Sequence, residues 1–172
     1  MANLPEPVYN LVEETHPALQ KELPPFDFSN PPIDPVQLSS DLHHTMSYAG
    51  GLGLAANQVG LEHRVFVLNT SPRPLTMFNP RITWYDTDHK VMDEGCLTYP
   101  NLFIKIRRPD KVRIRYQDET GTTNTLVLDG MVGRAAQHEY DHLNGIVHLD
   151  RASPINSKKA KAKMKNLKRK LK

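Results

Sequence analysis

The first long periodic pattern of the chain is helical. Apolar side chains recur every three or four residues, as they do along one face of a helix, at Leu38, Leu42, Met46 and Ala49. A proline is favourable at the first position of a helix and paired glycines end one, so Pro35 and the glycines at 50–51 mark its two ends. The pattern predicts a helix over about residues 35–49.

Three later segments carry the residue types of β-strands instead. They are rich in β-branched and aromatic residues and cover residues 64–69, 75–84 and 111–117. In the third segment apolar and charged residues alternate, and the DETG turn at 118–121 leads into TLVLD at 125–129. Alternation of this kind predicts a half-buried antiparallel hairpin.

A second helix is expected from Met131 to His142, because no proline or β-branched run interrupts that stretch and Gly145 follows its last turn. The beginning of the chain is different, since eight of the 14 prolines lie within the first 35 residues and each removes a backbone donor. Residues 1–34 should therefore wrap the domain in short pieces. No repeat or linker divides the chain, so residues 1–157 are predicted to form one domain.

The charge is divided between the body of the chain and its C-terminal end. Residues 158–172 carry nine Lys or Arg and no acid, whereas the rest has 13 basic and 19 acidic residues, so the net charge of +3 hides an acidic body. The tail could form a helix with Met164, Leu167 and Leu171 on one face, and a polyanionic partner would meet it there. A solvated tail without a partner is the alternative.

Neither an apolar run long enough to span a membrane nor a secretory signal is visible, so a cytoplasmic protein without a membrane partner is expected. The single cysteine, Cys96, excludes an intrachain disulfide and suits a reducing compartment. Its thiol is then a metal ligand, a nucleophile or a buried structural group.

The segment QHEYDHLNG is the most informative about chemistry. His138 and His142 are four residues apart, so on a helix both imidazoles leave the same face and can bind one cation, with Glu139 beside them. Such a cation activates a water molecule, and a neighbouring carboxylate can move the proton. A pair of surface histidines on an amphipathic helix is the alternative.

A catalytic metal site with three protein ligands needs one more donor. Cys96 stands in a segment in which the preceding glycine allows close backbone approach, and it is one candidate. His148 and Asp150 lie downstream of His142, where zinc endopeptidases carry their third ligand. Both arrangements remain open on these residues alone.

The segment GLGLAANQVG at 51–60 combines small residues with Gln58, just before a predicted strand. It lacks the Lys and Ser/Thr of a P-loop and the spacing of a dinucleotide fingerprint, so nucleotide binding is excluded. The Gln58 side chain is a neutral donor that could polarise a substrate carbonyl, and the extended backbone before it could pair with a peptide-like substrate. The alternative is a tight turn with Gln58 on the surface.

In this order and at these separations, GLGLAANQ, EGCLT and QHEYDHLNG closely resemble the three signature motifs of the peptide deformylase family, over roughly residues 35–150. The resemblance implies an α+β fold in which antiparallel strands pack around a central metal-binding helix. It also implies hydrolysis of the N-formyl group from N-formylmethionyl nascent peptides, with release of formate. The cofactor would be one divalent metal ion, natively Fe²⁺ in many members, for which Zn²⁺, Ni²⁺ or Co²⁺ can substitute.

Carried over residue by residue, the resemblance implies a role for each matching position. The metal ligands would be Cys96, His138 and His142. Glu139 would be the general acid/base, while the Gln58 side chain and the backbone N–H of Leu97 would stabilise the oxyanion. The positions that would hold the substrate backbone and its methionine side chain are Leu52, Gly53, Gly95, Met92, Met131 and Ala135. Glu94 and Arg108 match an ion pair that would brace the cysteine loop.

Two residues depart from the family pattern. Thr98 replaces the more usual serine but keeps a hydroxyl, and Arg134 puts a charge in a stretch that is often apolar, so the resemblance does not define the rim of the pocket. The tail at 158–172 resembles in composition the basic extension that some members use near the ribosome exit tunnel, and it predicts ribosome binding. A monomer is expected. A zinc endopeptidase and a nucleic-acid-binding protein acting through its tail are the alternatives, but neither explains three coordinated motifs.

Overall fold

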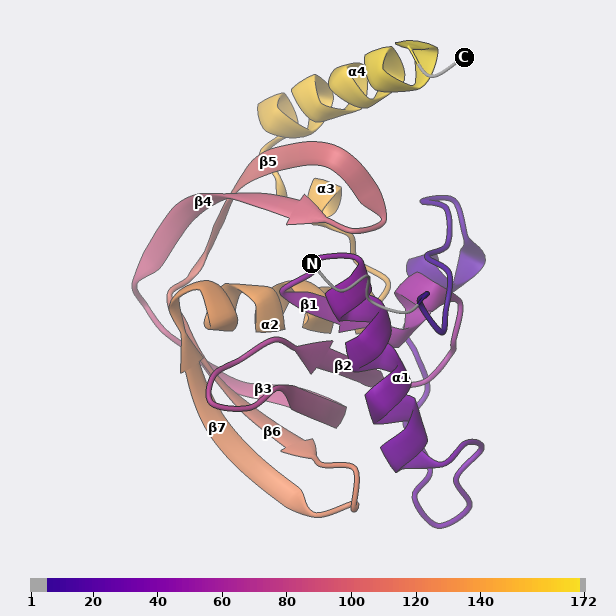
Figure 1. Ribbon diagram of the computed structural model, residues 1–172. Helices are drawn as coiled ribbons and strands as arrows, with labels where there is room; N and C mark the ends of the chain where they lie inside the picture. The colour runs from indigo at the N-terminus through magenta and orange to yellow at the C-terminus, as the bar shows by residue number, and fades with distance from the viewer. Residues whose placement is uncertain (1–5, 171–172) are drawn as a thin grey trace.

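An antiparallel sheet of five strands, in the order β1-β2-β3-β6-β7, forms the base of the fold (Figure 1). Its strands are β1 (Gly53–Ala55), β2 (Val65–Leu68), β3 (Leu75–Tyr85), β6 (Lys111–Gln117) and β7 (Thr123–Asp129). The structure, a computed structural model, describes residues 6–170. Strands and helices are mixed and all strand pairs are antiparallel, so the predicted α+β fold is confirmed.

Helices cover both faces of the sheet at its β1–β2 end. These are two 14-residue helices, α1 (Pro35–Tyr48) and α2 (Gly130–Leu143). All four side chains of β2 are buried, because Val65 and Val67 share a core with α1 while Phe66 and Leu68 share another with α2. A strand covered on both faces shows an unbroken apolar run, which is why β2 lacks alternation.

At its β6–β7 end the sheet is covered on one face only. Val112, Ile114 and Tyr116 of β6 are buried in the core shared with α2, whereas the basic residues between them are exposed. β6 pairs with β7 along its whole length. The half-buried hairpin that the alternation predicted is therefore confirmed.

A second sheet, which the sequence did not lead us to expect, is a hairpin of β4 (His89–Cys96) and β5 (Tyr99–Pro109). Cys96 pairs with Tyr99, so residues 97–98 form its tip. α2 lies between this hairpin and the five-stranded sheet (Figure 1). The hairpin thereby carries the cysteine to the face of α2 that the large sheet leaves open.

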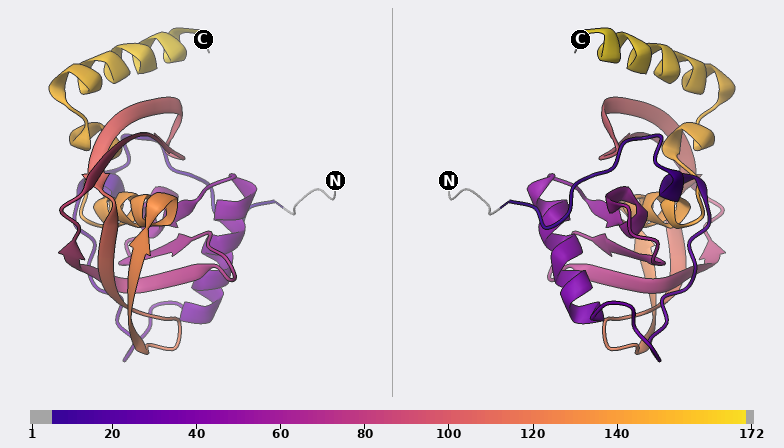
Figure 2. Two further views of the ribbon diagram at one scale, coloured as in Figure 1. Left: turned by 90° about the vertical axis from the view of Figure 1, so that its left-hand side faces the viewer. Right: turned by 90° about the vertical axis from the view of Figure 1, so that its right-hand side faces the viewer.

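The C-terminal part consists of α3 (His148–Arg151) and α4 (Pro154–Lys170). α4 lies across β5, at the end of the molecule remote from the five-stranded sheet (Figures 1 and 2). Ala160 and Met164, one turn apart, pack into the apolar cluster of β5, while Lys159 and Lys161 are exposed. The basic tail is thus a helix, and Leu171 lies outside the described residues.

Residues 6–34 run along the body and contain one short 3₁₀ helix, η1 (Pro17–Gln20). Backbone N–H groups of Val12 and Leu23 donate to carbonyls of Gln58 and Leu143, which ties the segment to the body. Residues 1–5 of the predicted wrap lie outside the described residues. Between residues 6 and 170, no helix has the length and apolarity that crossing a membrane requires.

Candidate metal centre

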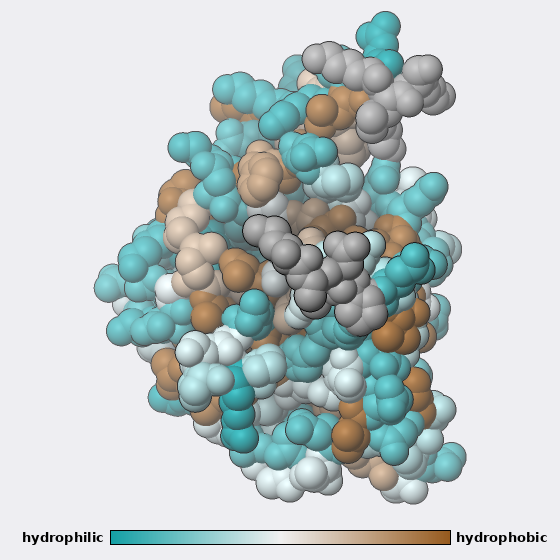
Figure 3. Space-filling model, in the orientation of Figure 1, coloured by the Kyte–Doolittle hydropathy of each residue, from teal (hydrophilic) through white to brown (hydrophobic). Residues whose placement is uncertain are grey.

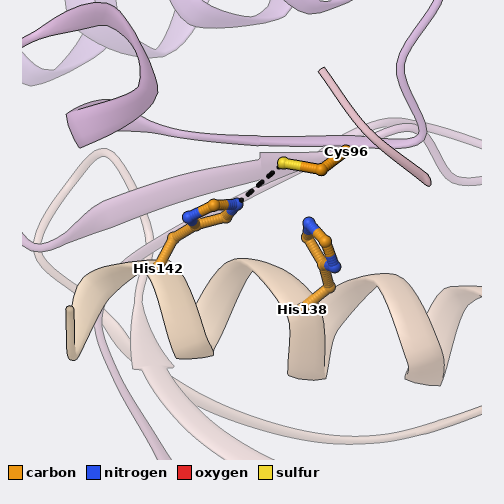
Figure 4. Close-up of side chains that lie close together, drawn as sticks. All are labelled: Cys96, His138 and His142. Atoms are coloured by element: carbon orange, nitrogen blue, oxygen red, sulfur yellow. Dashed lines mark hydrogen bonds between the residues drawn. The ribbon is translucent and has the colours of Figure 1, made fainter. Parts of the chain in front are cut away.

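Three side chains from distant segments converge beside α2. Cys96 stands at the end of β4, and His138 and His142 lie on successive turns of α2 (Figure 4). Their ligand atoms all lie within 4.8 Å of one another, and Cys96 Sγ is 3.3 Å from His142 Nε2. Within residues 6–170 this is the one cluster of Cys, His, Asp and Glu side chains close enough to share a metal ion.

This set of donors fits a divalent metal ion. A thiolate and two neutral imidazoles suit Zn²⁺, Fe²⁺, Co²⁺ or Ni²⁺. Tetrahedral coordination with ordinary bond lengths puts sulfur and nitrogen about 3.5 Å apart, close to the 3.3 Å between Cys96 and His142. Burial, and then the positive charges nearby, hold the pKa of His142 well below its usual value, so the ring is neutral and can donate its lone pair.

A buried carboxylate orients the other histidine. Glu94 Oε2 lies 3.2 Å from Nδ1 of His138, which leaves the second ring nitrogen for a metal. Arg108 donates to both oxygens of Glu94, at 2.6 and 3.0 Å. Burial alone would raise the pKa of Glu94, but the hydrogen bonds from His138 and Arg108 lower it to about 2. The pair is buried, unlike surface ion pairs that contribute little.

The ion-pair network extends to a residue that the sequence analysis missed. Arg108 Nη1 donates to Asp141 Oδ2 at 2.8 Å, and Arg151 donates to both oxygens of Asp141. Asp141 is 3% exposed. The sequence did contain a signal, since Asp141 stands directly before His142 in the QHEYDHL motif. An acidic side chain that is buried beside a histidine of this kind needs a positively charged partner.

Glu139 lies beside the histidines, on the wall of the adjoining cavity. Burial raises the pKa of Glu139 to about 7. A carboxyl group with a pKa near neutrality can both accept and return a proton. A Cβ at position 53 would come within 2.6 Å of Glu139 Oε1, so Gly53 leaves this carboxyl its place.

Gln58 is fixed toward the metal centre and is not on the surface. It belongs to the 3₁₀ helix η2 (Ala56–Val59), and its Oε1 accepts a hydrogen bond from the backbone of Ala55 at 2.9 Å. Its Nε2 donates to Thr98 Oγ1 at 3.2 Å and lies 3.5 Å from Cys96 Sγ. The hydroxyl that Thr98 keeps therefore orients the carboxamide. Leu97, at the hairpin tip, lines the same cavity.

A cavity of about 740 Å³ opens beside the metal centre. In Figure 3, apolar side chains gather beside the hollow below the β4–β5 hairpin. Five of the six predicted substrate-binding residues line the cavity, namely Leu52, Gly53, Gly95, Met131 and Ala135. Met92 is not among the lining residues: it stands two positions before Glu94 on the same face of β4, about 6–7 Å farther along the strand.

The downstream candidates for a third ligand do not join the cluster. The ring of His148 packs 5.8 Å from that of His138 and 5.1 Å from that of Tyr99, measured between centroids. Asp150 is exposed and accepts a hydrogen bond from the backbone of Val147. The described residues therefore do not form the endopeptidase-like arrangement, and the cluster that they do form contains Cys96 as its third member.

This chain is similar to known proteins in both sequence and fold. The family model described as polypeptide deformylase matches residues 8–158. Peptide deformylase 1 of Ralstonia nicotianae is 38% identical over 159 residues, which cover 91% of this chain and 93% of the relative.

Solved structures agree. The crystal structure of a peptide deformylase from Synechococcus elongatus in complex with actinonin has a TM-score of 0.86 and 31% identity, covering 94% of this chain and 90% of that chain. The peptide deformylase from Thermus thermophilus has a TM-score of 0.85 and 31% identity, covering 96% of this chain and 100% of that chain. The resemblance of the three motifs is confirmed. The chain therefore belongs to the polypeptide deformylase family of metal-dependent hydrolases, whose activity is the removal of N-formyl groups.

Proposed function

We propose that this protein removes the N-formyl group from N-formylmethionyl nascent peptides at the centre formed by Cys96, His138 and His142. The observation that carries the proposal is the position of these three side chains, together with Glu139, beside one cavity. A divalent ion bound by them supplies Lewis acidity, which activates a water molecule and polarises the formyl carbonyl.

The protein side chains perform the remaining steps. Glu139 accepts the proton of the attacking water and delivers it to the departing amine as the C–N bond breaks, which yields formate and a free N-terminus. Nε2 of Gln58 and the backbone N–H of Leu97 donate to the oxygen on which negative charge develops. The Glu94–Arg108 pair holds His138 in orientation throughout.

The substrate binds along β1. This strand is at the edge of the five-stranded sheet, and Gly53 at its start lines the cavity, so an extended peptide can pair with its free edge. Leu52, Met131 and Ala135 provide an apolar wall for the methionine side chain. A flexible methionine in that wall suits a thioether guest.

Substitution of Cys96 tests the ligand set. We expect Cys96→Ala to lose bound metal and to lose turnover of formyl-Met-Ala-Ser, because two imidazoles alone hold a divalent ion weakly. His148→Gln, which alters a buried histidine outside the ligand cluster, is the matched control and should keep its metal. Full metal occupancy in the Cys96→Ala protein would refute the proposal.

The native metal is Fe²⁺, with Zn²⁺, Ni²⁺ and Co²⁺ as substitutes. The thiolate and imidazole donors accept all four ions, and the choice of iron is taken from the family resemblance. An oxidisable ion beside an oxidisable thiolate should make activity decay in air. Anaerobic purification with metal analysis beside turnover tests this, and activity that follows zinc content and survives air would contradict it.

The basic face of α4 binds the ribosome. Lys159, Lys161, Lys163 and Lys165 are exposed, while Ala160 and Met164 anchor the helix on β5. Replacing these four lysines by glutamine keeps the anchor, and it should weaken co-sedimentation with ribosomes and flatten its salt dependence. A control variant that loses the same number of positive charges elsewhere has glutamine at four other exposed positions, namely Arg81, Lys105, Arg113 and Arg115. Unchanged co-sedimentation of the α4 variant would reject this role.

The protein works as a cytoplasmic monomer. Several of its exposed large apolar side chains, among them Tyr48, Leu52 and Phe103, line the cavity and so serve the substrate without a subunit interface. Its nascent-chain substrate and its lone cysteine suit the cytoplasm. Light scattering after size-exclusion chromatography tests the oligomeric state, and a dimer mass would contradict it.

A further inference from the structure

Arg134 brings a positive charge to the cavity wall, yet its guanidinium does not point toward a substrate. The residue is 5% exposed, and its Nη1 donates to Glu94 Oε1 at 2.6 Å. Nη1 also donates to the carbonyl of Ile106 at 3.1 Å, and Nη2 donates to the carbonyl of Lys90 at 2.7 Å. The head group is therefore bound to the β4–β5 hairpin, although the residue is among those that line the cavity.

These contacts join the elements that carry the metal ligands. Arg134 precedes His138 by four residues on α2, so the two side chains leave the same face of the helix. Its acceptors lie on β4 and β5, and β4 ends at Cys96. One side chain thus links the helix of the two imidazoles to the hairpin of the thiol.

The same contacts decide how the Glu94 carboxylate is used. Oε1 accepts from Arg134 Nη1 and Arg108 Nε, whereas Oε2 accepts from Arg108 Nη2 and faces His138 Nδ1. With two arginines on its oxygens, the carboxylate cannot turn without breaking short charge-assisted bonds. Arg134 therefore helps to keep Oε2 on the histidine.

Charge balance points the same way. Glu94 and Asp141 are two buried carboxylates that share Arg108. Arg151 supplies a second guanidinium to Asp141, and Arg134 supplies one to Glu94. Buried charges are tolerated only when they are paired, so Arg134 completes the pairing on the side that touches a metal ligand.

We propose that Arg134 is a positioning residue of the metal centre, which holds the orientation of His138 and the approach of the Cys96 hairpin to α2 and thereby slows the release of the metal. The inference rests on the ligand set of the proposed function. It gives a role to a buried charge that the proposed reaction does not use.

The test compares Arg134→Met with Arg64→Met. Arg64 is a matched control because it is also largely buried and donates two hydrogen bonds, to Leu143 O at 3.2 Å and Asn144 Oδ1 at 3.0 Å, at the C-terminal end of the same helix. Removing it loosens α2 without touching Glu94. Both variants are loaded with Co²⁺, and the release of the metal to a chelator and the thiolate-to-cobalt absorption band are recorded.

We expect Arg134→Met to release metal about 10- to 100-fold faster than wild type, with a shifted thiolate band, since residues behind the ligands commonly affect metal affinity by that factor. Arg64→Met should release metal at the wild-type rate. Should Arg134→Met fail to fold, Arg134→Lys, which keeps the charge but cannot reach three acceptors, should show the same acceleration to a smaller degree.

Release at the wild-type rate from a folded Arg134 variant would overturn the inference, and so would equal acceleration in both methionine variants, which would indicate general loosening of α2. A wild-type protein that takes up no metal would instead refute the proposed ligand set. The two failures are therefore distinguishable.

Discussion

Helices α1 and α2 have the same length and both pack on the large sheet, but they bury different chemistry. α1 buries an apolar row of Leu38, Leu42 and Met46, and Asp34 caps its first turn. The buried face of α2 is mostly polar or charged, with Arg134, Gln137, His138, Glu139, Asp141 and His142. The first helix is specified by its own cap and apolar row, whereas the second also depends on charged partners that other segments supply.

The contrast shows where function has been favoured over stability. On α2, buried Asp141 is paired with Arg108 and buried Arg134 is paired with Glu94, but Oε2 of Glu139 is buried and has no hydrogen-bond partner among the described residues. A carboxyl group left in this state destabilises the fold when ionised. Such a group is retained where its reactivity is needed.

The largest effect is expected from removing that group. Glu139→Gln should lower turnover of formyl-Met-Ala-Ser by about 100- to 10,000-fold, because a neutral amide cannot carry the proton. With both proteins free of metal, the variant should unfold at the same temperature as wild type or a higher one, since burial disfavours the ionised carboxyl of Glu139 and raises its pKa. Glu62→Gln, on the surface, is the control. A large loss of stability in Glu139→Gln would contradict the contrast between the helices.

The opposite behaviour is expected from α1. Leu42 is completely buried, and Leu42→Ala should reduce the free energy of unfolding by about 2–5 kcal/mol through lost burial and a residual cavity. Activity per folded molecule should stay at the wild-type level. Val36→Ala, at a position 58% exposed on the same helix, should change little. Urea denaturation measures the loss of stability, and assays of formyl-Met-Ala-Ser turnover run in parallel measure activity. A fall in the activity of Leu42→Ala as large as that of Glu139→Gln would contradict the distinction between the two helices.

A smaller effect concerns how the two helices begin. Asp34 accepts hydrogen bonds from the backbones of Val36 and Gln37, at 2.8 and 2.9 Å, so Asp34→Ala should lower the free energy of unfolding by about 0.5–2 kcal/mol. Asp129 precedes α2 but makes no capping bond, so Asp129→Ala should cost less. Equal losses in thermal unfolding would show that local capping does not separate the helices.

The smallest effect is a dependence of stability on pH that originates on α1. Burial lowers the pKa of His43, whose ring is hydrogen-bonded to Thr76. The negative charge of Glu119 offsets only part of this lowering. The unfolded chain therefore takes up a proton near pH 6.5 that the folded protein refuses, so stability is full above that value and falls as pH drops below it.

His43→Gln should reduce this fall between about pH 7.5 and pH 5.5, as measured by urea unfolding. The pKa values of His63 and His148 are shifted in the same direction and that of His138 in the opposite one, so only the difference between wild type and variant isolates His43. An identical pH dependence in both proteins would contradict the assignment.

Local sequence was sufficient where the cause of structure is local. The helix predicted over 35–49 is observed at Pro35–Tyr48, and the hairpin at 111–129 is observed with its alternation. The hairpin at 89–109 was overlooked, although Leu102, Ile104 and Ile106 alternate with exposed residues. The apolar pattern ends at two arginines, and one of them, Arg108, is buried only because of its ion pairs.

The sequence by itself determined the family, the helical pair of imidazoles and the identity of a single thiol, since residue type and spacing along one helix suffice for these. Only the tertiary structure decided that Cys96 lies beside His142, 46 positions away, and that Arg134 donates a hydrogen bond to Glu94. It also decided that Met92 is not among the residues lining the cavity. The physical reason is that a buried charge is stable only beside its partners, and the distances between such partners depend on how the hairpin packs on the helix.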